Sequence, residues 1–263
     1  MRAREFIIER FDISWIQPWI VRSAGSIKTY SNDADWYSRF FKNLSKDQEF
    51  VKWRDSLKFP LKIQPKIKDD QTSTQSVLGG EHYTDDDPIQ HIVSIEVNLA
   101  RTPTDDKTFN VFLNRLSTTM AHELNHASQR DKQLRKFNDA DQVFDLKSHS
   151  IFKNTPPEPT GSNKQLESYY LYLLDHMETD AFVSGAAQEI TNSLGSNSLK
   201  SLNHIFQAVK KDQYVTVAGK IINLPALKSL HDALGYYETY LKRNREYEWD
   251  RIKKRLYQYI KKQ

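Results

Sequence analysis

Residues 120–129, MAHELNHASQ, contain two histidines four positions apart, with a glutamate directly after the first. Residues four apart lie on one face of an α-helix, so His122 and His126 can direct two imidazoles at a single metal ion. Glu123 lies about 100° further round such a helix. From there it can reach a water bound to the ion and act as a general base. The alternative is a polar patch on an ordinary amphipathic helix.

A catalytic zinc ion takes three protein ligands and keeps one position open for water. The best candidate for the third ligand is Glu178, in the segment DHMETDAF, where the small Ala181 would let two helices approach closely. Asp175 is expected to support the site by accepting a hydrogen bond from the outer nitrogen of a ligand histidine. Asp180 lies about 200° from Glu178 on a helix, so only one of these two carboxylates can face the metal. Asp180 is the next candidate as ligand or supporting group, followed by His176 and His149.

The elements that must hold these side chains can be predicted from periodicity. HIVSIEVNL at 91–99 alternates apolar and polar residues and predicts a strand. Thr104, with two aspartates behind it, predicts a helix start. The apolar spacing that follows predicts one helix over about 107–129, with the histidine motif in its last turns. A second helix, over about 164–192, would carry Glu178.

The rest of the chain completes the predicted fold. Residues 1–57 are rich in aromatic side chains and predict a helical region, and LKIQPKI at 61–67 predicts a strand. Residues 72–88 are rich in turn formers, and residues 198–263 predict about three helices with a short break. The sequence therefore predicts a mostly helical α+β fold with a small mixed or antiparallel sheet. It divides into an N-terminal helical region over 1–57 and a second domain over 58–263.

Composition narrows the classes of site and of protein. The 263 residues include no cysteine, so disulfides and thiolate metal sites are excluded and any metal must be held by His, Asp or Glu. The net charge of +4 does not by itself indicate an acidic partner such as nucleic acid. No stretch resembles a signal peptide or a membrane span. These features predict a cytoplasmic protein without a membrane partner.

The motif HELNH at 122–126, followed by Glu178-Thr179-Asp180-Ala181, resembles the gluzincin branch of the zincin metallopeptidases. The resemblance covers about residues 90–190. It implies a zincin-like core in which His122, His126 and Glu178 bind Zn²⁺ and Glu123 is the base. With the GGEHY segment at 79–83, the chain also resembles HExxH proteins of large tailed bacteriophages, which would place it in the host cytoplasm or the virion. Many gluzincins have an aspartate four residues after the ligand glutamate, where this chain has Phe182.

The expected activity is hydrolysis of peptide bonds in a peptide or protein substrate. The ion would polarise the scissile carbonyl and lower the pKa of its bound water, and Glu123 would pass the proton to the leaving amine. The oxyanion needs a further donor, for which His231 is the first candidate. Other candidates are Tyr169, Tyr170, Tyr172, His204, Tyr236 and Tyr237. The strand at 91–99 would hold the extended substrate if it lies at the sheet edge; the alternative is an interior strand.

The C-terminal residues 241–263 contain nine Lys or Arg and three acidic residues, a net charge of +6. An apolar stripe runs through them at helical spacing and predicts a docked terminal helix with solvated charges: Trp249, Ile252, Leu256 and Ile260. The alternative is a contact with nucleic acid or an acidic protein. Three functions follow: a zinc peptidase, a non-catalytic metal-binding structural protein associated with a phage, and a nucleic-acid-associated protease. The sequence does not specify an oligomeric state.

Overall fold

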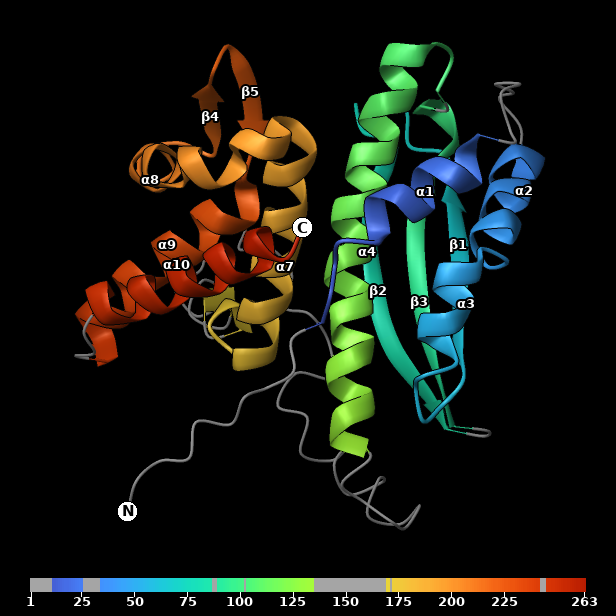
Figure 1. The fold of residues 1–263 in the computed structure, drawn as a ribbon, viewed down its shortest axis with the longest axis horizontal. Helices are drawn as coiled ribbons and strands as arrows, with labels where there is room; N and C mark the ends of the chain where they lie inside the picture. Colours follow the sequence, from blue (N-terminus) through green and yellow to red (C-terminus); the bar gives the residue numbers. More distant parts are fainter. Residues whose placement is uncertain are drawn as a thin grey trace.

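One long helix, α4, carries the histidine motif, and it lies between a three-stranded sheet and a second group of helices (Figure 1). The computed structural model describes residues 11–25, 34–86, 89–101, 103–134, 169–170, 172–241 and 245–263. Its helices are α1 (Ile16–Ala24), α2 (Ala34–Leu44), α3 (Gln48–Arg54), α4 (Asp106–Leu134), α7 (His176–Leu194), α8 (Ser198–Ala208), α9 (Pro225–Leu241) and α10 (Arg245–Lys261). Its strands are β1 (Leu61–Lys68), β2 (Val77–Asp86), β3 (Ile89–Asn98), β4 (Tyr214–Val217) and β5 (Lys220–Asn223). This is the mostly helical α+β architecture with a small mixed sheet that the sequence predicts.

The sheet has the order β1-β3-β2, with β1 parallel and β2 antiparallel to β3. The strand predicted over 91–99 is β3, and it is the central strand, so the prediction that it could hold substrate at the sheet edge is wrong. Its polar Ser94 is fully buried, and Lys66 of β1 and Glu81 of β2, on either side of β3, form an ion pair at 2.9 Å. The edge strand beside α4 is β2, in a segment where the sequence predicts only turns.

Helix α4 begins where the sequence predicts and extends five residues beyond the predicted end, to Leu134. The carboxylate of Asp105 accepts a hydrogen bond from the backbone N–H of Thr108 at 2.7 Å, so Asp105 caps the helix in place of the predicted Thr104. The apolar stripe Phe112, Leu113, Leu116, Met120 and Leu124 is buried. This burial fixes the rotation of α4 and, with it, the direction in which the motif histidines point.

The N-terminal helices α1 to α3 pack through aromatic side chains. Trp19 of α1 stacks on Phe50 of α3 with ring centroids 4.8 Å apart, and Trp36 of α2 contacts Phe112 of α4 at 5.7 Å. Asp47 caps α3 by accepting from the backbone N–H of Glu49 and Phe50. The buried side chains of these helices and of residues 58–263 form one continuous hydrophobic core among the described residues.

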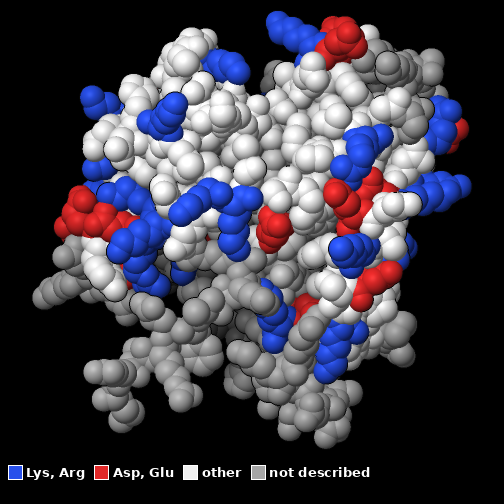
Figure 2. Space-filling view, in the orientation of Figure 1, with Lys and Arg blue, Asp and Glu red and all other residues white. Residues whose placement is uncertain are grey.

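The C-terminal part contains α7 to α10 and a β4–β5 hairpin, which occupies the break predicted between helices. The apolar stripe of α10 is buried: Trp249, Ile252, Leu256 and Ile260. The predicted docking of the terminal helix is therefore confirmed. On the face shown in Figure 2, Lys and Arg side chains lie over both halves of the molecule, interspersed with acidic ones. On α10, Arg251 pairs with Glu248 and Lys253 with Asp250.

Within the described residues, no helix combines the length and the apolar character needed to cross a bilayer.

Candidate metal centre

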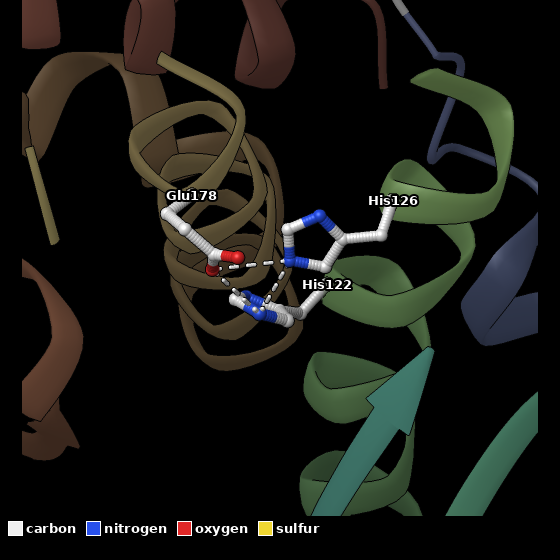
Figure 3. Close-up of side chains that lie close together, drawn as sticks. All are labelled: His122, His126 and Glu178. Carbon is white, nitrogen blue, oxygen red and sulfur yellow. Dashed lines mark hydrogen bonds and ion pairs between the residues drawn. The ribbon is translucent and has the colours of Figure 1, made fainter. Parts of the chain in front are cut away.

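The structure brings the three predicted ligands together between α4 and α7 (Figure 3). The Nε2 atoms of His122 and His126 lie 3.1 Å apart. Glu178 Oε2 lies 3.2 Å from His126 Nε2 and 3.9 Å from His122 Nε2. The side chains are only 11–17% exposed. Two imidazoles and one carboxylate thus converge on a single point.

These separations fit a metal ion. Zn–N bonds of about 2.0–2.1 Å at tetrahedral angles place two ligand atoms about 3.3 Å apart. The three distances between the candidate ligand atoms, 3.1, 3.2 and 3.9 Å, lie on either side of that value. The helices therefore already stand at a separation that suits a bound ion. Glu178 Oε2 is buried and accepts no hydrogen bond of adequate geometry among the described residues. A buried carboxylate oxygen without a donor is costly, and a cation at this point would satisfy it.

The close approach of α4 and α7 depends on small residues of α7. Ala181 is fully buried, as its predicted role requires. Gly185, one turn further on, is the closer contact: a Cβ there would lie 3.3 Å from the carbonyl oxygen of Thr118 and 3.8 Å from the Cβ of His122. Even the Cβ of an alanine at 185 would require the backbone of α4 or α7 to shift by a few tenths of an ångström.

Glu123 lies between the ligand pair and strand β2. Its Oε1 is 4.0 Å from His122 Nε2, and its carboxylate accepts a hydrogen bond from the backbone N–H of His82. Strand β2 can approach this closely because residue 80 is glycine: a Cβ there would lie 2.8 Å from Glu123 Cγ. Burial raises the pKa of the Glu123 carboxyl to about 7, helped by nearby Glu178 and opposed by His126. A carboxyl with this pKa can take up and release a proton near neutral pH.

The two histidines differ in their surroundings. Burial, together with nearby His126, lowers the pKa of His122 well below its usual value. Burial also lowers the pKa of His126, but Glu178 outweighs it, so that pKa ends above its usual value. The imidazole of His122 is hydrogen-bonded to the backbone carbonyl of Ala181. Since its Nε2 faces Glu178, the donor is Nδ1, and this bond orients the ring as a metal ligand requires.

Phe182, which stands where many gluzincins have an aspartate, packs its ring against His122 with centroids 4.5 Å apart. In this chain His122 is therefore oriented by donating a hydrogen bond to a backbone carbonyl, and a neighbouring aromatic ring covers the imidazole. An acidic residue at 182 is not needed for either role.

The two aspartates predicted to support the site have other partners. Asp175 precedes α7 and caps it, because its carboxylate accepts from the backbone N–H of Met177 and Glu178. It is therefore not on the face of the helix that the sequence interpretation assumed. Asp180 points away from the three candidate ligands, as the helical geometry predicts, and its carboxylate accepts from Tyr259 of α10 at 2.9 Å and from Gln129 of α4 at 3.1 Å.

His231, the predicted oxyanion donor, lies on α9 and is buried. Arg245 Nη2 lies 3.0 Å from its Nε2, and its ring packs against Trp249 at 5.1 Å. Burial, with help from Arg245, lowers the pKa of His231. No interaction found for His231 among the described residues involves a member of the metal centre. Of the tyrosines named as alternatives, Tyr172 is connected to the site through its ring contact with Phe182 at 6.3 Å.

Sequence reasoning missed a buried polar chain behind His126. The ring of His82 stacks on that of His126 with centroids 6.4 Å apart. His82 Nε2 lies 3.1 Å from His91 Nδ1, and His91 Nε2 lies 3.6 Å from Asp131 Oδ1. The signal in the sequence is the alternation of β2, which puts Gly80 and His82 on the same face, toward α4.

Comparisons of the chain with family models, with curated proteins and with solved structures found no match.

Proposed function

We propose that the protein is a zinc-dependent metallopeptidase. The observation that carries the proposal is the convergence of His122, His126 and Glu178 beside the buried carboxylate of Glu123. A purely structural zinc site is usually closed by four protein ligands, whereas three ligands leave one coordination position open for water. The carboxylate of Glu123 beside that position is the base that hydrolysis requires, and the resemblance of HELNH to the gluzincin motif supports the same assignment.

The charge around the site favours a divalent cation. Glu123, Glu178 and Asp180 are all largely removed from solvent, and none of them forms an ion pair with Lys or Arg among the described residues. Buried carboxylates are stable when a cation compensates them. When bound, Zn²⁺ supplies Lewis acidity, which polarises a carbonyl group and lowers the pKa of a coordinated water.

The chain's own residues then hold the reactants and move the proton. Glu123 Oε1 takes the proton released on attack and returns it to the leaving amine. The backbone N–H of His82 fixes the orientation of that carboxylate. Burial acts to raise the pKa of the Glu123 carboxyl, which favours uptake of the proton during the reaction.

The substrate would be an extended peptide or protein segment that lies along β2. This strand has a single neighbour, β3, among the described strands, so its other edge offers backbone N–H and C=O groups for pairing. The same strand contacts Glu123 through Gly80. A peptide paired with β2 would therefore lie beside the metal centre. We therefore assign to β2 the substrate-holding role that the sequence suggests for the strand at 91–99.

The first experiment is metal analysis of the purified protein together with cleavage of an unstructured protein such as casein, with and without chelator. Glu123→Gln is expected to retain one metal ion per chain and to lose cleavage. Glu178→Ala should lower metal occupancy. The matched control is Glu189→Ala, on the same helix, whose carboxylate bonds Thr118 instead of the centre.

Full cleavage by Glu123→Gln would refute the assignment of the base. A wild-type protein that binds zinc tightly but cleaves nothing would favour the non-catalytic structural role.

A further inference from the structure

Tyr259 of α10 contacts both helices that carry the metal ligands. Its hydroxyl donates to Asp180 Oδ2 of α7 at 2.9 Å and accepts from Asn125 Nδ2 of α4 at 3.2 Å. Gln129 of α4 donates to the same carboxylate oxygen at 3.1 Å. Tyr259 is 1% exposed and Asn125 is also 1% exposed. A single buried hydroxyl thus bridges α4 and α7.

This bridge lies behind the metal centre. Asp180 is two residues from Glu178, about 200° round α7, and Asn125 directly precedes His126. The ligands therefore meet on one side of the helix pair and the Tyr259 network on the other. An ion held by these three ligands would join α4 and α7 on one side, and the Tyr259 network joins them on the other.

We propose that docking of the C-terminal helix α10 and metal binding are energetically coupled through the hydroxyl of Tyr259. Tyr259 acts as a positioning residue, because its hydroxyl bonds Asp180 and Asn125, which stand beside the candidate ligands in the sequence and are not ligands themselves. The inference rests on the metal centre of the proposed function, though not on peptidase activity. Coupling between two binding events is reciprocal, so metal must stabilise docked α10 by the same factor by which docked α10 strengthens metal binding.

The test is the Zn²⁺ affinity of Tyr259→Phe, measured by competition with a chromophoric chelator. The substitution keeps the buried ring and removes only the hydroxyl. The expected result is zinc binding weaker by about 5- to 10-fold, within the usual range of coupling between sites. The matched control is Tyr257→Phe, on the same helix, which is 46% exposed and should bind zinc as the wild type does. Thermal unfolding of both variants without metal separates a loss of stability from a loss of affinity.

A second measurement uses the wild type and needs no variant. Hydrogen exchange of the α10 backbone amides is compared in zinc and in chelator, with α3 as the internal reference. Coupling predicts that zinc slows exchange in α10 more than in α3, and that Tyr259→Phe loses most of this extra protection.

The outcomes are distinct. If the wild type binds no metal, the proposed function fails together with this inference. If the wild type binds zinc but Tyr259→Phe binds it equally well, and zinc gives α10 no extra protection, the coupling is refuted and the metal centre stands. A Tyr259→Phe protein that unfolds more easily yet keeps wild-type zinc affinity would show a structural role only.

Discussion

Gly80 is the residue at which the packing around Glu123 can be tested most directly. In Gly80→Ala, the new Cβ would lie 2.7 Å from Thr119 Cγ2 and 2.8 Å from Glu123 Cγ, against the 3.4 Å at which ordinary contact begins. Glu123 Cγ lies in the middle of a side chain that is 5% exposed, and Thr119 Cγ2 belongs to a short β-branched side chain, so neither atom can move aside freely. Strand β2 must therefore move away from α4, or Glu123 must leave its position. Overpacking of this kind costs about 1–3 kcal/mol of unfolding free energy.

The expected effect on turnover is larger than the effect on metal binding. A displacement of about 1 Å at a catalytic group lowers the rate on the order of 100-fold, whereas the three ligands do not contact residue 80 directly. The assay is kcat/KM on a cleaved peptide, with metal content and Tm measured on the same preparations. Gly79→Ala is the matched control, because a Cβ at 79 meets nothing within 4 Å. If the two variants have equal Tm and equal turnover, the close packing of β2 on Glu123 is refuted.

Three further predictions follow from the described contacts. Removal of zinc by a chelator should lower Tm, because zinc at a free concentration of 100 times its Kd adds about 2.7 kcal/mol to the free energy of unfolding. An unchanged Tm in a calorimetric scan would argue against the metal site. Asp131→Ala should lower the free energy of unfolding in urea by about 2 kcal/mol, because Asp131 Oδ1 accepts hydrogen bonds from the backbone N–H of Lys58 and Phe59. Asp131→Asn keeps an acceptor oxygen, so it should lower the free energy of unfolding by less. Asp47→Ala should lower the free energy of unfolding by about 1 kcal/mol, because it removes the N-cap of α3. In Asp47→Asn the asparagine can still cap the helix, so this variant should lose mainly the ion pair with Arg22.

The last of these variants has a defined pH dependence. Burial raises the pKa of Asp47, but the hydrogen bonds from Arg22 and from the backbone of α3 outweigh it, so the pKa in the folded protein lies below 3.8. A folded-state pKa below the unfolded value adds stability above the unfolded pKa, and this is lost as pH falls through the folded pKa. The difference in unfolding free energy between the wild type and Asp47→Asn should therefore be constant near pH 7 and shrink below pH 3.8. If the difference in unfolding free energy between the two proteins grew as the pH fell, the stated direction of the pKa shift of Asp47 would be wrong.

The three candidate ligands could be predicted from the sequence because their geometry depends mostly on spacing within single helices. The spacing of His122 and His126 defines a common helix face, and the apolar stripe of α4 determines which way that face points. Glu178 could be predicted from ligand chemistry and from the small residue Ala181, one helical turn further on. Strand β2 could not be predicted in this way. Glycines lower strand propensity and suggest a turn, but here Gly80 leaves the space that the side chain of Glu123 fills, and that contact joins residues 43 positions apart.

The support of His122 shows a deeper reason for the limits of sequence reasoning. A carboxylate that orients a ligand histidine would appear in the sequence as an Asp or Glu at a fixed distance, which is why Asp175 was assigned that role. In the structure the imidazole is hydrogen-bonded to the carbonyl of Ala181. Every residue has a backbone carbonyl, so a hydrogen bond to the backbone cannot be recognised from the type of residue at that position. What the sequence does record is the condition for that bond: small side chains at 181 and 185, which let α7 come close enough to α4 for its backbone to reach the ring.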